Sequence, residues 1–280
     1  MDRTTIGSVA LMFVAMSLIP LGDSAGKLLT TAHGASPFFV AFSRFAVGAA
    51  MVAVILGGRV DWGLYRNWRV WFRAFLIAAG IACILNALRT EDIATVFGAF
   101  FVGPIFSYVL SVWLLGERVR PLQSVLLAVG FCGVLLVVRP GFGMTPGLGF
   151  AVAAGLFYGA FLTASKWLAE IAPPRQLMLT QTLLGTVMLA PLGLVELPEA
   201  TAAVTGLVLV SGLASATGNL LLVLAYRRSS ATMLAPFVYF QLISATALGW
   251  LVFGTWPDPL ALAGLVILVA AGFGTLALRR

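Results

Sequence analysis

The sequence predicts an all-α polytopic membrane protein with ten transmembrane helices, arranged as two inverted five-helix repeats. Three observations lead to this prediction: the composition, the length of the apolar runs and a likeness between the two halves of the chain. The chain has 280 residues, of which 61% are hydrophobic and only 10% are charged. A soluble domain carries roughly 25% charged residues, so this composition suits a lipid bilayer and not water.

The apolar runs have the length of membrane-spanning helices. Crossing the ~30 Å hydrocarbon core takes about 20 helical residues, so a chain of this length with short loops holds about ten spans. A membrane β-barrel would show short segments of alternating polarity, and the runs here are long and unalternated. The predicted spans are 6–31, 36–57, 70–89, 92–115, 121–138, 147–169, 175–194, 202–226, 230–253 and 259–278.

Glycine, proline and charged residues separate the spans, as expected for loops. The separating segments are 34–37, 57–68, 139–146, 172–174, 196–199 and 255–259. None of them is long enough to link two independently folded domains. A cleavable signal peptide is an alternative for the first apolar run; we disfavour it because its removal would break the repeat described below.

Basic residues define the orientation, because lysine and arginine collect in short cytoplasmic loops. With the N-terminus inside, most of the 17 basic residues fall on the cytoplasmic side. They are Arg3, Arg59, Arg66, Arg69, Arg73, Arg118, Arg120, Lys166, Arg175, Arg227, Arg228, Arg279 and Arg280. Only Lys27, Arg89 and Arg139 lie toward the outer side, and Arg44 lies within a span. The sequence therefore predicts a multi-pass protein of a bacterial-type cytoplasmic membrane with both termini in the cytoplasm.

The two halves of the chain repeat one pattern, in which residues 87–121 align with residues 225–259. The matched positions are Ala94-Thr95 with Ala231-Thr232, Trp113-Leu114 with Trp250-Leu251, Gly116 with Gly254, Pro121 with Pro259, Gly26-Lys27 with Ser165-Lys166 and Pro37 with Pro174. Two copies of a five-span unit lie in opposite orientations because five is odd, and such inverted repeats are typical of secondary transporters. We expect one repeat in residues 1–140 and the other in 147–280.

One segment, ATVFGAFFVGPIFSYVLSVWLLGERVRPLQSVLLAVGFCGVLLVV, resembles the signature of EamA-type transporters in the drug/metabolite transporter superfamily. The features that carry the resemblance are Ala94-Thr95, Pro104, Leu114-Leu115-Gly116-Glu117-Arg118, Gly130 and Gly133, together with Arg44-Phe45 in span two. The second copy departs from this pattern. Thr255 stands where the signature has glutamate, and Gln241 stands near the position of Pro104.

The resemblance implies a ten-helix bundle that exports small metabolites, with spans 1, 3, 4, 6, 8 and 9 lining a cavity. Within the family the chain looks most similar to exporters of aromatic and other neutral amino acids. A carrier of another small metabolite or drug, such as a purine or a sugar derivative, is the alternative. A channel and an intramembrane enzyme are the other classes that we weighed.

Three ionisable residues lie inside spans, where charges usually face a cavity or one another. Asp23 and Lys27 are one helical turn apart, and Pro20 and Gly22 precede them. We expect this proline and glycine to loosen the helix and free backbone carbonyls, which would create a contact for substrate or ion. The alternative is a structural salt bridge that ties span one to Arg44 in span two.

Polar and aromatic residues in the middle of spans form the second candidate group, because an amide in hydrocarbon needs a partner on another helix or on a substrate. The candidate substrate-binding residues are Asp23, Lys27, Asn86, Phe101, Tyr108, Tyr158, Phe161, Asn219, Phe237, Tyr239, Gln241 and Ser244. For each aromatic residue, lipid contact or helix packing is the alternative interpretation.

A structural or gating role is expected for Arg44, Pro104 and Glu117. The last of these lies at the inner end of span four, where an inner gate or an interfacial charge cluster would account for it. Spaced glycines such as Gly103, Gly155 and Gly159 let helices approach closely.

Enzyme chemistry has no support in the sequence. It contains no HExxH, no GxSxG and no phosphate-binding loop. The two cysteines, Cys83 and Cys132, lie in separate apolar runs without metal-ligand spacing. We expect no metal, no cofactor and no nucleic acid; the expected partners are a small-molecule substrate and the lipid bilayer, and the expected state is a monomer.

Overall fold

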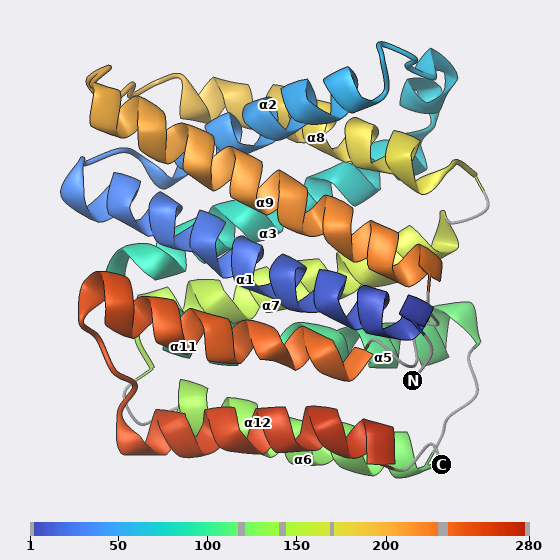
Figure 1. Cartoon of the computed structure of the whole chain (residues 1–280), viewed down its shortest axis with the longest axis vertical. Coiled ribbons are helices and arrows are strands. Elements are labelled where there is room, and N and C mark those ends of the chain that lie inside the picture. The colour runs from blue at the N-terminus through green and yellow to red at the C-terminus, as the bar shows by residue number, and fades with distance from the viewer. Residues whose placement is uncertain (1–2, 117–120, 140–143, 169–170, 229–234, 278–280) are drawn as a thin grey trace.

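A computed structural model describes residues 3–116, 121–139, 144–168, 171–228 and 235–277, which are helical with short connections and contain no strand (Figure 1). The helices are α1 (Arg3–Ala32), α2 (Pro37–Ile55), η1 (Trp62–Arg66), α3 (Trp68–Thr90), α4 (Ile93–Phe100), α5 (Val102–Leu115), α6 (Pro121–Val138), α7 (Pro146–Trp167), α8 (Pro174–Gly193), α9 (Ala202–Arg228), η2 (Ala235–Tyr239), α11 (Phe240–Phe253) and α12 (Pro259–Ala277). The predicted all-α architecture of ten helices is confirmed, with α4 and α5 forming the fourth and η2 and α11 the ninth.

Six segments are long and apolar enough to cross a membrane by themselves. They are Gly7–Ala32, Pro37–Ile55, Trp68–Thr90, Ile93–Leu115, Pro146–Trp167 and Ala202–Ala225. Three further apolar helices within the described residues are shorter: Ser124–Val138, Phe237–Phe253 and Pro259–Gly274. All of them lie in one bundle (Figure 1).

Local chemistry explains where the helices begin. Proline occupies a first-turn position of α2, α7 and α8, where its missing N–H removes no helical hydrogen bond. Side chains of Ser36, Asn67, Asp92 and Thr145 accept hydrogen bonds from backbone N–H groups at the starts of α2, α3, α4 and α7. These caps satisfy donors that would otherwise be orphaned. The segments rich in glycine, proline and charge are therefore the helix boundaries, as the sequence predicts.

The contacts between helices have the symmetry of an inverted repeat. The strongest pairs join α1 with α9 and α3 with α7, which are spans 1 and 8 and their counterparts 6 and 3. Likewise, α5 packs on α7 as α11 packs on α1. The pairs α2 with α8 and α6 with α12 map onto themselves, and Figure 1 shows them at the two extremes of the long axis. Gly116 and Gly254 end α5 and α11 with positive φ of 66° and 64°, which matches their alignment in the repeat.

Glycines allow a close contact between α7 and the segment formed by α4 and α5. A Cβ atom at Gly155 would lie 2.5 Å from the carbonyl oxygen of Phe100, and one at Gly159 would lie 2.4 Å from that of Gly103. The backbones therefore touch directly, as the small-residue spacing predicts.

A helix break lies in span four and not in span one. Pro104 has no N–H for the carbonyl of Phe100, and the chain separates into α4 and α5 around Phe101. The expected loosening of span one is wrong, because α1 continues as one helix through Pro20. The carbonyl of Pro20 instead accepts a hydrogen bond from Ser24 Oγ at 2.8 Å.

We expect Gly159→Ala to destabilise the protein by about 1–3 kcal/mol, because the new methyl group overpacks the α5–α7 contact. Gly206→Ala is the matched control, since a Cβ atom there meets nothing within 4 Å. Thermal unfolding of the purified variants in detergent measures the difference. Equal melting temperatures for Gly159→Ala and the unchanged protein would contradict this packing account.

Candidate functional site

Two adjoining chambers lie between the two halves of the bundle. The central chamber has a volume of about 370 Å³ and reaches Asp23, Phe97, Tyr239 and Gln241. The second, which we call the Arg73 chamber, has a volume of about 390 Å³. Residues lining both are Arg44, Ile77, Ile81, Tyr158, Leu162, Ser215, Asn219 and Leu222. Each volume lies in the range of small-molecule sites, about 300–1,000 Å³.

The spans that line the chambers include all those that the family resemblance implies, and further spans contribute as well. Spans 1, 3, 4, 6, 8 and 9 all contribute to the central chamber. Arg44 of α2 and Leu127 of α6 also reach it, and α8 contributes Gln181 and Thr182 to the Arg73 chamber.

Aromatic rings form much of the central chamber's wall. The rings of Phe101 and Tyr239 have centroids 4.9 Å apart, and those of Phe100 and Tyr158 are also 4.9 Å apart. Each pair joins elements from opposite halves of the chain. Phe161 continues this surface into the Arg73 chamber, stacked on Tyr158 at 6.0 Å. Such surfaces offer large apolar contact areas to a planar ligand.

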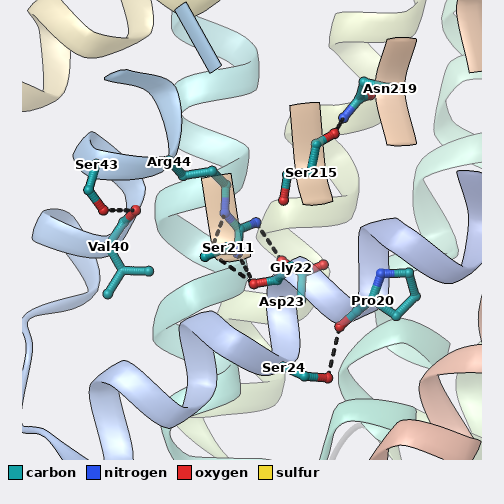
Figure 2. Close-up of polar contacts among 10 residues, drawn as sticks. All are labelled: Pro20, Gly22, Asp23, Ser24, Val40, Ser43, Arg44, Ser211, Ser215 and Asn219. Carbon is teal, nitrogen blue, oxygen red and sulfur yellow. Dashed lines mark hydrogen bonds and ion pairs between the residues drawn. The ribbon is translucent and has the colours of Figure 1, made fainter. Parts of the chain in front are cut away.

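A buried ion pair links α1 to α2 at the edge of the central chamber (Figure 2). Arg44 Nη1 donates to Asp23 Oδ1 at 2.5 Å, and the two residues are only 6% and 2% exposed. Arg44 Nη2 donates to the carbonyl of Gly22 at 2.9 Å, and Ser211 Oγ accepts from Nε at 3.3 Å. Every nitrogen of this guanidinium is thus bonded. The structure thus contains a salt bridge that ties span one to Arg44 in span two.

Neutral polar groups on α8 and α9 face the chambers. Asn219 Nδ2 donates to the carbonyl of Ser215 at 2.8 Å, so this amide remains close to its own helix (Figure 2). Ser215 Oγ and Gln181 Oε1 are buried without a hydrogen-bond partner among the described residues. Buried polar atoms are nearly always bonded, so these two atoms are candidates for contact with a ligand or water.

Lys27 lies at the opposite end of the bundle from Arg73 and lines neither chamber. Its Nζ donates to the carbonyl of Glu91 and lies 5.2 Å from the ring centre of Phe253. The carboxylate of Glu91 accepts from Thr145 Oγ1 at 2.5 Å. These contacts join α1, α7, α11 and the connection between α3 and α4, so they close this end of the bundle.

The structure brings most of the predicted binding residues to the chambers and leaves others outside. Those on the walls are Asp23, Phe101, Tyr108, Tyr158, Phe161, Asn219, Tyr239 and Gln241, together with Arg44 and Pro104. Their roles in binding stay predictions. Glu117 lies outside the described residues.

Four predicted residues do not line the chambers, and Lys27 is one of them. Asn86 Nδ2 donates to the carbonyl of Ala82 on its own helix at 2.8 Å. Phe237 packs against the rings of Phe13 and Phe273. Ser244 Oγ lies 3.3 Å from Ser17 Oγ, which joins α11 to α1. Helix packing accounts for each of these three contacts.

Sequence analysis missed Arg73 as a site residue. It was assigned to the basic residues of the cytoplasmic side, yet it is only 7% exposed and lines a chamber. A signal was present, because Arg73 lies in an apolar run beyond the interfacial residues Trp68 and Trp71. Gln181 was missed as well, although it interrupts the apolar pattern of span seven between two threonines.

A ten-helix bundle with a cavity between two inverted repeats defines a membrane transporter. The chain belongs to the EamA-like transporter family, whose sequence model matches residues 6–139 and 145–277. The predicted family and the prediction that the protein is no enzyme are confirmed.

Similar proteins of known name are also transporters. A riboflavin transporter of Rhizobium johnstonii is 30% identical over 213 residues, which are 73% of this chain and 68% of the relative. A pseudopaline exporter of Pseudomonas aeruginosa is 25% identical, with 83% of each chain covered. An S-adenosylmethionine uptake transporter of Rickettsia prowazekii is 20% identical over 96% of this chain and 92% of the relative. These relatives support a small-metabolite transporter and differ in cargo and direction.

One solved crystal structure of another protein has the same fold. It superposes with a TM-score of 0.67 at 19% identity and covers 97% of this chain and 96% of its own.

The Asp23–Arg44 pair generates a testable prediction. Asp23→Asn leaves a buried guanidinium without its carboxylate, and we expect a loss of about 3–5 kcal/mol. Arg44→Gln should destabilise similarly, whereas the double variant should lose clearly less than the two single losses combined. Thermal unfolding in detergent of the unchanged protein, the two single variants and the double variant measures these losses. Additive losses would show that the two side chains act independently.

Proposed function

We propose that the chain is a secondary transporter that exports small metabolites, with aromatic and other neutral amino acids first among them. The observation that carries this proposal is the central chamber, whose walls combine paired aromatic rings with neutral polar side chains from both halves of the chain. A planar ring has apolar partners there, and its polar substituents have hydrogen-bonding partners.

Alternating access is the proposed mechanism, with residues 1–140 and 147–280 as the two moving repeats. Inverted repeats of near-equal structure can exchange conformations and so open a central site to either side. Contacts around Lys27 close one end of the bundle, whereas the Arg73 chamber extends toward the other end at Ala172 and Pro174. This difference between the ends supports a carrier that opens to one side at a time.

The proposed location is the cytoplasmic membrane, with both termini in the cytoplasm. Helix α1 begins and α12 ends on the same side of the bundle (Figure 1). The distribution of basic residues supports a cytoplasmic location for that side, and in this orientation the Arg73 chamber extends toward the cell interior. A carrier in this state is ready to load its substrate for export.

A flavin is the second candidate substrate. The observation that favours it is the 30% identity to the riboflavin transporter, together with the two adjoining chambers of about 370 and 390 Å³. Their aromatic walls suit a tricyclic ring as well as a single one.

Counterflow in proteoliposomes tests the proposed function. Vesicles preloaded with unlabelled phenylalanine, tryptophan, leucine, riboflavin or adenine receive a labelled trace of the same compound, with and without a pH gradient. We expect saturable accumulation with the aromatic amino acids, because a carrier exchanges its substrate across the membrane. Adenine is not an amino acid and should accumulate little. Accumulation with riboflavin alone would favour the second candidate, and accumulation with none would refute both. Conductance without counterflow would indicate a channel.

Tyr158 tests the aromatic wall, since its ring lines both chambers. We expect Tyr158→Leu to raise the half-saturating concentration of tryptophan about 2- to 10-fold, because aromatic contacts contribute roughly 0.5–1.5 kcal/mol each. Leucine should be affected much less. Trp113→Leu is the matched control, because Trp113 is 78% exposed on the outside of the bundle. An unchanged tryptophan response in Tyr158→Leu would remove the ring from the site.

A further inference from the structure

Arg73 is a buried cation whose charge the described residues leave uncompensated. Its Nε donates to Ser165 Oγ at 2.8 Å, and its Nη1 donates to the carbonyl of Leu177 at 3.0 Å. The guanidinium carbon lies 4.5 Å from the ring centre of Phe161. None of these partners carries a negative charge, and the ion pairs found among the described residues join other groups.

Comparison with Arg44 shows what is unusual about this environment. Both arginines line the Arg73 chamber, and both are less than a tenth exposed. Arg44 has a carboxylate partner and protein hydrogen bonds at every nitrogen. Of the five donors on Arg73, protein hydrogen bonds to described residues use one on Nε and one on Nη1. Three donors of Arg73 are thus available to a ligand, whereas four of the five donors of Arg44 are engaged.

The same chamber holds two further groups that need a partner. Gln181 Oε1 and Ser215 Oγ are buried and unbonded among the described residues, and both line the chamber with Arg73. A buried guanidinium without an anionic partner and a buried amide oxygen without a hydrogen bond are costly. A ligand that brings an anionic group for Arg73 and an N–H or O–H for Gln181 satisfies both.

We propose that the Arg73 chamber is a carboxylate-binding subsite, in which Arg73 receives the carboxylate of an aromatic organic acid whose ring lies along Tyr158 and Phe161. This inference rests on the proposed transport function and names the substrate group that the protein recognises. A carboxylate fits one guanidinium in charge and geometry, since the two can form parallel hydrogen bonds. An α-amino acid also supplies the N–H donor that the Gln181 oxygen requires.

A purely structural Arg73 is the competing explanation, because its two hydrogen bonds tie α3 to α7 and α8. The two explanations differ in one measurable property. A structural arginine stabilises the fold without regard to the charge of the ligand. A carboxylate receptor makes binding depend on that charge.

A matched pair of probes separates the two roles: 3-phenylpropionate and its amide, which have the same ring and chain length and differ in charge. Binding to the purified chain in detergent is measured from the concentration dependence of its melting temperature, at constant pH and ionic strength. We expect the unchanged protein to bind the acid at least about 10-fold more tightly than the amide, because hydrogen bonds to charged groups are the stronger ones. Equal affinities, or binding of neither probe, would overturn the proposal.

Substitutions then assign the preference to Arg73. We expect Arg73→Gln to weaken binding of the acid about 10- to 100-fold while leaving the amide nearly unchanged. Arg69→Gln is the matched control, because Arg69 lies one turn earlier on α3, stacks on Trp167 and lines neither chamber. The control should retain the full preference for the acid. An equal loss in both variants would indicate general electrostatics and overturn the subsite.

Arg73→Lys keeps the test decisive if Arg73→Gln does not fold. Lysine retains the charge but not the parallel hydrogen bonds, so the acid should bind less tightly yet remain preferred over the amide. Loss of all affinity for the amide together with the acid would instead indicate a collapsed chamber and a structural arginine.

If counterflow fails for every amino acid while the acid preference depends on Arg73, the proposed cargo is wrong and the subsite stands. If amino acids are exchanged and Arg73→Gln keeps the preference, the subsite is wrong and the transport function stands.

Discussion

The bilayer offers no water to its interior, so every polar group inside the bundle needs a partner within the protein. The Asp23–Arg44 pair meets this constraint most completely. The guanidinium on α2 binds a carboxylate and a backbone carbonyl of α1 and a serine of α9, so the contact joins three helices. Hydroxyl groups elsewhere meet it locally, as Ser24 does by donating to Pro20. Unbonded polar atoms therefore stand out, and two of them, on Gln181 and Ser215, lie on the chamber walls.

Inverted symmetry governs the packing but not the chemistry of the two halves. The contact of α1 with α9 has its counterpart in that of α3 with α7, and the turns at Gly116 and Gly254 match closely in φ. Arg44 does not follow this symmetry. Span two carries Arg44, whereas its counterpart α8 carries Gln181 and Thr182. A carrier needs similar scaffolds to exchange conformations, but one substrate needs only one set of binding groups.

The sequence predicts the scaffold well, because span length and the chemistry of helix ends are local properties. Proline and capping residues mark boundaries such as Pro37 and Thr145 wherever the chain places them. The site is harder to predict, because it depends on which helix faces meet. Pro20 lies in a continuous helix, while Pro104 separates α4 from α5. The same residue type thus has different outcomes in the two helices.

The position of Arg73 could not be predicted from the sequence either, and this residue makes the two ends of the bundle different. A count of basic residues assigns it to the cytoplasmic surface, and only the packing of α3 against α7 and α8 encloses it. At the opposite end, Lys27 likewise has a carbonyl and an aromatic ring as partners, and it also lies near the acidic residues Glu91 and Asp92. Closing the Arg73 end around an empty chamber would strand a guanidinium away from water, which is unfavourable. A bound carboxylate removes that penalty, so the anion site proposed for Arg73 would make closure easier for the loaded carrier than for the empty one. Such a difference favours exchange of one substrate for another over return of the empty carrier.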